Sequence, residues 1–137
     1  MRMKLDPGAY EPIRAHATDA GLDLKTPIDI YLPVGDSVTI NTGVHIELPP
    51  GYYGKIESKS GLNVNHGVVS CGGVIDEGYT GAIAVKLYNF GIREYQFKSG
   101  DKIAQLIIQP YVAPAIFIVD ELDDTPRGDN GFGSTGK

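Results

Sequence analysis

Alternation of apolar and polar residues dominates the hydrophobic pattern of this chain, and the periodicity of helices is nearly absent. Apolar side chains occupy alternate positions in residues 38–40, 44–48 and 83–87. Turn signals rich in glycine, proline and asparagine recur at intervals of roughly eight to twelve residues. This spacing predicts many short β-strands joined by tight turns.

Three further segments complete the predicted elements. The run KIAQLIIQ, residues 102–109, predicts a buried strand, and residues 112–122 predict one more strand interrupted by Pro114. Only GLNVNHG, residues 61–67, predicts a helix, and it is barely two turns long. Together these elements predict an all-β protein, an antiparallel jelly-roll β-sandwich or barrel with one short helix.

The hydrophobic pattern stops at Asp123. From there the sequence DDTPRGDNGFGSTGK contains one large apolar residue, Phe132. A segment of this composition cannot bury a core and is expected to be a mobile arm. We therefore expect one β-domain over residues 1–122 and a C-terminal arm over residues 123–137.

Composition and charge narrow the classes of function. The 137 residues are 42% hydrophobic and 21% charged, as in an ordinary globular domain. The net charge of −5, with lysines and arginines scattered singly, does not favour binding to long nucleic acids, and no apolar run reaches membrane-spanning length. Because Cys71 is the only cysteine and MRMKLDPGAY lacks the apolar region of a signal peptide, we expect a cytoplasmic protein.

The segment SCGGVIDEGYTG, residues 70–81, is the first candidate for chemistry. It places Asp76 directly after two apolar β-branched residues. In one interpretation Asp76 and Glu77 simply begin a turn. In the other interpretation, the hairpin backbone forms hydrogen bonds with a flat ligand, and Asp76 is directed at a water molecule. Gly72 and Gly73 suit the second interpretation, because glycine lets a backbone approach a ligand closely.

Other polar segments are candidates for binding an anion or a metal. In SKSGLN, residues 58–63, the groups around Lys59 suit an anion, or form a helix start with an ordinary solvated lysine. In ATDAGLDLK, residues 17–25, Asp19 and Asp23 face a metal, or are turn and edge residues. GFGSTGK has the spacing of a phosphate-binding P-loop, but no residues follow for the helix that a P-loop requires. The three histidines are far apart in sequence, so no zinc site is expected.

The order of these segments is more specific than any one of them. AGLDL, KSGL, GVIDEGYTG, GDKIAQLI and RGDNGFGSTG follow one another between about Ala15 and Gly136. Together they resemble the five signature motifs of the trimeric deoxyuridine triphosphatase (dUTPase) family. The resemblance implies a jelly roll, a homotrimer with arms exchanged between subunits, and Mg²⁺-assisted hydrolysis of dUTP to dUMP and pyrophosphate. The reaction is an attack of water on the α-phosphorus, and it keeps uracil out of DNA.

The resemblance also implies roles for individual residues. Asp76 resembles the general base for the attacking water, and Asp23 a residue that touches Mg²⁺ only through its bound water. Tyr79 resembles the ring that packs under the deoxyribose and excludes a 2′-hydroxyl. The remaining substrate contacts match the uracil-reading hairpin at Gly73, Val74 and Ile75, with Ser70 and Ala84; the phosphate contacts at Lys59, Ser60, Gly61 and Gln105; and the arm residues Arg127, Phe132, Gly133, Ser134 and Thr135.

Some residues depart from the family pattern. Lys59 and Lys102 stand where arginine is commoner, and at Lys59 a bidentate phosphate contact becomes a point charge. Thr80 replaces the common arginine or glutamine. Taken singly, Tyr79 fits a core aromatic and Lys59 a surface charge. Two other functions stay open: a dCTP deaminase-like enzyme of the same fold, against which KSGL and GVIDEGYTG argue, and a non-catalytic nucleotide-sensing module.

Overall fold

The computed structural model describes residues 1–131. These residues form eleven strands and one helix. In chain order the elements are β1 (Arg2–Leu5), β2 (Gly21–Lys25), β3 (Ile30–Leu32), β4 (Ser37–Asn41), β5 (Val44–Glu47), β6 (Tyr52–Glu57), α1 (Ser60–His66), β7 (Val68–Cys71), β8 (Val74–Ile75), β9 (Ala84–Asn89), β10 (Tyr95–Phe97) and β11 (Lys102–Pro110). Every strand pair in this part of the chain is antiparallel. The all-β prediction with one short helix is confirmed.

Alternating burial explains why the predicted strands form. In β9 the side chains of Val85 and Leu87 are fully buried, whereas Ala84 is exposed. Val44 and Ile46 of β5 are buried in the same way. Because successive side chains of a strand point to opposite faces, this pattern gives each strand one apolar face for the core.

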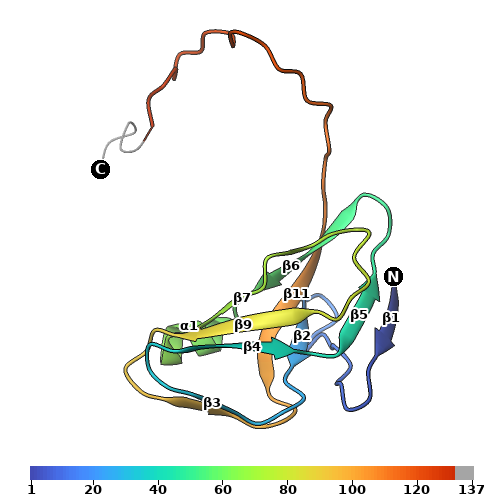
Figure 1. Ribbon diagram of the computed structural model, residues 1–137, viewed down its shortest axis with the longest axis vertical. Coiled ribbons are helices and arrows are strands. Elements are labelled where there is room, and N and C mark those ends of the chain that lie inside the picture. The colour runs from blue at the N-terminus through green and yellow to red at the C-terminus, as the bar shows by residue number, and fades with distance from the viewer. Residues whose placement is uncertain (132–137) are drawn as a thin grey trace.

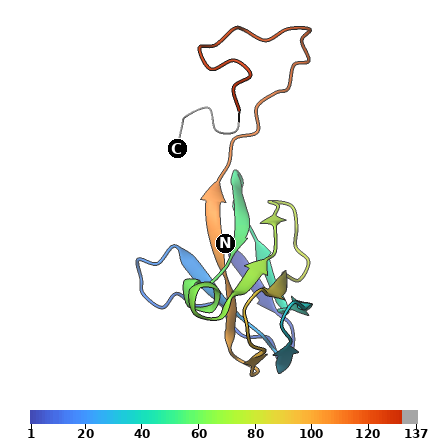
Figure 2. The same ribbon diagram turned by 90° about the vertical axis from the view of Figure 1, so that its left-hand side faces the viewer.

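Two main sheets pack around that core (Figures 1 and 2). One sheet has the strand order β2-β11-β6-β8 and the other has β4-β9-β7, while β1-β5 and β10-β3 form two-stranded ribbons. One apolar cluster contains Leu106 and Ile56 of the first sheet together with Leu87 and Val68 of the second. The sandwich leaves β2 and β8 as the outer strands of the four-stranded sheet, and both lead to candidate site residues.

The helix α1 begins at Ser60, one residue before its predicted start. Lys59 precedes it in an extended conformation and makes no side-chain cap hydrogen bond. Gly67 ends it with a φ of 69°, and its amide donates to the carbonyl oxygens of Asn63 and Leu62. A Cβ atom at Gly67 would lie 2.6 Å from the Gly91 backbone, so both the left-handed turn and the close approach require glycine.

Within the described residues, no helix has the length and apolar character that crossing a membrane demands.

The strand predicted over residues 112–122 is wrong. No strand forms between residues 111 and 131, and Val112, Ile116 and Ile118 are 88%, 89% and 98% exposed. The chain leaves the sandwich after β11 and runs away from it (Figures 1 and 2). An apolar extended segment becomes a strand only when a sheet edge accepts its hydrogen bonds, and Pro114 has no amide proton to donate. The division at residue 122 between domain and arm stays a prediction.

Candidate active site

The turn after β8 positions Asp76. Val74 and Ile75 pair with Lys55 and Gly54 of β6, and the side chain of Ile75 is buried. Asp76 is the next residue and is exposed, and its carbonyl accepts a hydrogen bond of 3.0 Å from the amide of Tyr79. The buried strand therefore fixes the backbone on one side of Asp76 while its carboxylate is open to water.

A shallow pocket of about 230 Å³ surrounds this turn, and we call it the Asp76 pocket. Its lining residues are Gly72, Val74, Ile75, Asp76, Tyr79 and Ala84. The structure thus brings together five of the predicted residues from two segments of the chain. Gly73 lies in the same connection with a φ of 71°, and its carbonyl accepts a hydrogen bond from the amide of Ile56.

Tyr79 forms one wall of the Asp76 pocket and is not a core aromatic, because it is 46% exposed. Its hydroxyl donates to the carbonyl of Ala82 at 3.0 Å. A Cβ atom at Gly81 would lie 2.4 Å from the Tyr79 hydroxyl, so the ring lies directly against this glycine. The loop is folded over its own tyrosine, which leaves the ring in a fixed position at the pocket.

A second group of residues, which we call the Asp23 cluster, consists of Asp23, Lys59, Lys102, Gln105 and Ser58. The Asp23 side chain is only 9% exposed, and its two oxygens are paired with different lysines. Lys102 Nζ lies 2.6 Å from Oδ2, and Lys59 Nζ contacts Oδ1. Burial alone would raise the pKa of the Asp23 carboxyl, but the two ammonium groups outweigh it and hold the pKa below its usual value.

Gln105 and Ser58 tie the Asp23 cluster to neighbouring strands. Gln105 of β11 lies opposite Asp23 on one side and Glu57 on the other. Its amide nitrogen donates to the carbonyl of Ser58 at 3.1 Å. The Ser58 hydroxyl in turn donates to the carbonyl of Ser70 and accepts from its amide, at 3.0 and 2.9 Å. These bonds fix the loop that begins at Ser58 and carries Lys59, Ser60 and Gly61 into α1.

Ser70 lies below the surface, on strand β7. It is 6% exposed and does not line the Asp76 pocket. Its hydroxyl oxygen is buried and finds no hydrogen-bond partner among residues 1–131. Leaving such a group unpaired costs about 1–3 kcal/mol, so a partner such as water is expected there.

The Asp76 pocket and the Asp23 cluster lie far apart within one chain. Three strand spacings of about 4.8 Å separate β2 from β8, which gives about 14 Å across the sheet. Asp76 is level with Tyr53 of β6, because Ile75 pairs with Gly54. Asp23 is level with Glu57, four residues further along, which adds about 13 Å. The Cα atoms of the two aspartates are therefore roughly 19 Å apart.

Of the predicted arm residues, the structure describes Arg127, which lies in neither group. Arg127 is exposed in the segment that runs away from the sandwich, and its Nε donates to the carbonyl of Asn130 at 3.1 Å. The predicted residues Phe132, Gly133, Ser134 and Thr135 lie outside the described residues.

Sequence reasoning missed the contacts of two residues, Lys102 in the Asp23 cluster and Glu77 next to Asp76. Lys102 was noted only as a replacement for arginine, yet it shares the buried carboxylate with Lys59. Glu77 was interpreted as a turn residue, yet its carboxylate accepts from the amide of Gly51 at 2.8 Å and from the hydroxyl of Tyr111 at 2.9 Å. The hydrogen bond to Glu77 raises the pKa of the Tyr111 phenol. Lys102 lies in the motif GDKIAQLI and Glu77 in GVIDEGYTG. Their partners are distant in sequence, so the motifs alone do not identify them.

The strand order and the antiparallel pairing define the chain as a jelly-roll-like β-protein. The dUTPase family model matches residues 9–136. The deoxyuridine 5′-triphosphate nucleotidohydrolase of Paramecium bursaria Chlorella virus 1 is 42% identical over 97% of this chain and 94% of that protein. The chain belongs to the dUTPase family.

Solved structures agree with this assignment. A variant of the Staphylococcus bacteriophage 80alpha dUTPase, with dUpNHpp, matches with a TM-score of 0.91 and 28% identity, over 99% of this chain and 98% of that chain. A variant dUTPase from phage phi11 of S. aureus, whose structure describes the coordination of a structural Mg(II) ion, matches with a TM-score of 0.81 and 29% identity, over 88% of this chain and 96% of that chain.

Proposed function

We propose that this protein hydrolyses dUTP to dUMP and pyrophosphate by attack of a water molecule on the α-phosphorus. The observation that carries the proposal is the Asp76 pocket, in which an exposed carboxylate, a fixed tyrosine ring and a glycine-containing hairpin meet. Membership of the dUTPase family supports the choice of substrate. The proposed place in metabolism is the removal of dUTP, so that uracil is kept out of DNA.

Asp76 is the proposed general base. Its carboxylate is exposed and follows a buried strand, so it can accept a hydrogen bond from water without moving its backbone. Orienting the water and taking its proton contribute to the rate together, and positioning of this kind lowers the entropic part of the barrier.

The hairpin and Tyr79 are proposed to select the nucleotide. Backbone groups between Gly73 and Ile75 would read the edge of uracil, since Gly73 leaves open space where a Cβ would stand. Tyr79 would lie beneath the deoxyribose and leave no room for a 2′-hydroxyl. The unpaired hydroxyl of Ser70 suits a contact to the base through water.

A magnesium ion fits this site as part of the nucleotide complex. Among residues 1–131 no group of three or more carboxylate, histidine or cysteine side chains could hold an ion. Mg²⁺ keeps several waters and is often bound through substrate phosphates, where it would neutralise their charge. Asp23 suits a contact to such a water once Lys59 or Lys102 leaves its carboxylate for a phosphate oxygen.

The spacing of the two groups supports a site shared between subunits, which is consistent with the homotrimer that the family resemblance implies. Asp76 must face the α-phosphorus, and Lys59, with Ser60 and Gly61 beside it, is proposed to bind a phosphate of the same nucleotide. A separation of roughly 19 Å is too long for that within one chain. We therefore propose that the Asp76 pocket of one subunit faces the Asp23 cluster of another. The arm residues Arg127, Phe132, Gly133, Ser134 and Thr135 would then close over the nucleotide from an exchanged arm.

The experiment is a nucleotide panel. Purified protein is incubated with dUTP, dCTP, dTTP and UTP, with and without Mg²⁺, and the products are identified. We expect pyrophosphate and dUMP from dUTP with Mg²⁺, and far less product from UTP. Ammonia release from dCTP would indicate a deaminase, and binding of dUTP without any pyrophosphate would indicate a sensing module. Either result contradicts the proposal.

A further inference from the structure

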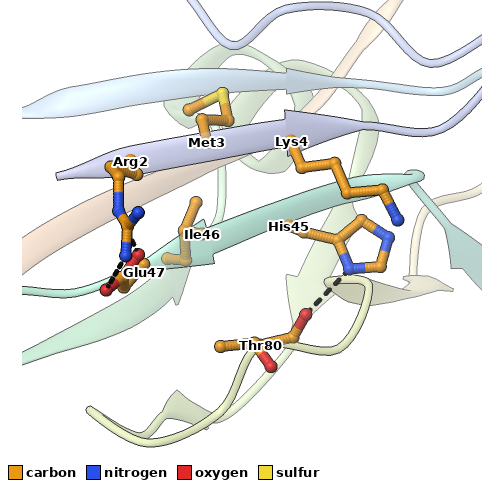
Figure 3. Close-up of a pocket in the computed structure, with 7 residues that line it drawn as sticks. All are labelled: Arg2, Met3, Lys4, His45, Ile46, Glu47 and Thr80. Carbon is orange, nitrogen blue, oxygen red and sulfur yellow. Dashed lines mark hydrogen bonds and ion pairs between the residues drawn. The ribbon is translucent and has the colours of Figure 1, made fainter.

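A second hollow, of about 510 Å³, lies beside the loop that carries Tyr79 (Figure 3). Arg2 and Lys4 of β1, His45 and Glu47 of β5, and Thr80 contribute to its lining. The His45 ring points from β5 toward Thr80, the residue that follows Tyr79. Its side chain is 19% exposed, so water reaches it only in part.

Both ring nitrogens of His45 face acceptor oxygens. Nδ1 lies 2.8 Å from the carbonyl oxygen of Thr80, and Nε2 lies 3.1 Å from Oδ2 of Asp6. Neither a carbonyl nor a carboxylate can donate a proton, and a neutral imidazole carries only one N–H. Neutral His45 would therefore direct a lone pair at one of these oxygens. The imidazolium form donates to both and is the form that this geometry accommodates.

This contact restrains the loop over Gly78–Ala82. Within that loop, the Tyr79 amide bonds to Asp76 and the Tyr79 hydroxyl to Ala82. Among residues 1–131, the bond from His45 to Thr80 is the one hydrogen bond that joins Gly78–Ala82 to a strand of the sandwich. Asp6, the other partner of His45, is itself fixed, because its amide donates to the carbonyl of Gly43 at 2.9 Å.

We propose that doubly protonated His45 is a positioning residue, which holds the Thr80 carbonyl and thereby the Tyr79 ring at the Asp76 pocket. The inference rests on the proposed function, in which Tyr79 lies against the sugar. His45 touches no substrate, and it acts through the loop. Deprotonation leaves His45 one N–H, which stays at Nε2 toward the Asp6 carboxylate because an ionised acceptor makes the stronger bond. The bond from Nδ1 to the Thr80 carbonyl is then lost, and the loop carrying Tyr79 can move.

The groups around His45 determine the pH at which its imidazolium form loses a proton. The carbonyl of Thr80 and then the carboxylate of Asp6 raise the pKa of His45, while burial and the ammonium of Lys4 oppose them. The neighbouring Arg2 and Glu47 pair with each other, with Arg2 Nε 2.5 Å from the Glu47 carboxylate. Because the pKa of His45 is raised on folding, its contribution is complete below the ordinary histidine value of about 6.5. It is lost as the pH rises through the higher value of the folded protein.

The test compares His45→Gln with a matched control, His16→Gln. Glutamine keeps a donor but does not titrate, and His16 is a surface histidine beside Asp19, with Nδ1 3.8 Å from Oδ2. kcat and KM for dUTP and UTP are measured between about pH 5 and pH 9. In the wild type and in His16→Gln we expect the KM for dUTP to rise, and the preference over UTP to fall, as the pH passes the pKa of His45. His45→Gln should show a flat profile and a KM raised about 2- to 10-fold, with kcat nearly unchanged.

A second measurement needs no turnover. The His45 ring and the amides of Thr80 and Gly81 are followed by NMR in the free protein over the same pH range. We expect one shared titration above the ordinary histidine pKa, and Asp6→Asn should move it to lower pH. An ordinary or lowered His45 pKa, loop amides that do not follow it, or an unchanged KM profile in His45→Gln would overturn the proposal. Absence of dUTP hydrolysis in every variant would instead contradict the proposed function and leave this titration as the test of His45.

Discussion

Two aspartates at the outer strands of the same sheet, Asp23 within β2 and Asp76 directly after β8, lie in opposite environments. Asp76 is exposed directly after β8, and its side chain makes no hydrogen bond or ion pair among residues 1–131. Asp23 of β2 is buried, and both of its oxygens are paired with lysines. The same type of side chain thus has a different role at each of the two positions. An open carboxylate is free to bind a water molecule, whereas a buried and paired one fixes cations in place.

The largest expected effect comes from Asp76→Asn. The change removes the proposed base but no contact of the fold, so kcat should fall about 10²- to 10⁴-fold. The free energy of unfolding should stay within about 0.5 kcal/mol of the wild type. Steady-state kinetics and urea unfolding measure the two quantities. Asp36→Asn, at another exposed aspartate in the β3–β4 turn, is the control and should leave kcat unchanged. A fully active Asp76→Asn protein would remove Asp76 from the mechanism.

Complementation between chains tests whether the two groups come from different subunits. Asp76→Asn and Lys59→Ala proteins, each weakly active, are unfolded together and refolded as mixed trimers. If each site takes its pocket from one chain and its Asp23 cluster from another, about one quarter of the sites are intact. Pyrophosphate release should therefore rise to about a quarter of the wild-type rate.

The control for complementation mixes Asp76→Asn with the double variant Asp76→Asn/Lys59→Ala, which contains no intact pocket. That mixture should stay inactive. Verified mixed trimers of the two single variants that also stay inactive would mean that both groups belong to one chain's site.

The main effect of Asp23→Asn should be on the free energy of unfolding, and not on the step in which Asp76 acts as the base. The substitution leaves Lys59 and Lys102 without their carboxylate, and breaking a fully buried pair costs about 3–5 kcal/mol. The lysine side chains are 26% and 38% exposed, so solvent should reduce the cost to about 1–3 kcal/mol. Urea unfolding measures it, with Asp76→Asn as the matched control. Equal free energies of unfolding for Asp23→Asn and Asp76→Asn would contradict the stabilising role assigned to the Asp23 pairs.

The pH dependence of that stability difference is a smaller effect. The pKa of Asp23 is lowered on folding, so its contribution is complete above the ordinary aspartate value of about 4. It is lost as the pH falls through the lower value of the folded protein. The gap in unfolding free energy between wild type and Asp23→Asn should thus be constant from about pH 7 to pH 5 and shrink below pH 4. A gap that grows in acid would reverse the assigned direction.

Much of the fold could be predicted from the sequence because its signals are local. Alternation identified the strands that contain Val85 and Val44, and Gly67 marked the end of α1, as the structure has them. The strand predicted over residues 112–122 failed for a non-local reason. Its residues have strand-like composition, but a strand also requires a partner edge, and in this chain they find none between residues 1 and 131.

The candidate site divides in the same way. The motifs identified Asp76, Tyr79 and the hairpin from Gly73 to Ile75, which are close in sequence and therefore close in space. Ala84 followed from the family resemblance, and the structure places it in the same pocket. The partners of Asp23 and the role of Glu77 depend on residues far along the chain, and no local pattern specifies them.

The sequence by itself determined the all-β class, the short helix and the family, because alternation, turn residues and ordered motifs are local features of the sequence. Only the tertiary structure decided which polar groups meet: Lys102 with Asp23, the Tyr111 hydroxyl with Glu77, and His45 with the carbonyl of Thr80, which is 35 residues away. The physical reason is that such contacts follow from strand order and register. These are set by the packing of the whole core, and a change of one residue in the register of their strands would turn Asp23, His45 or Lys102 to the other face.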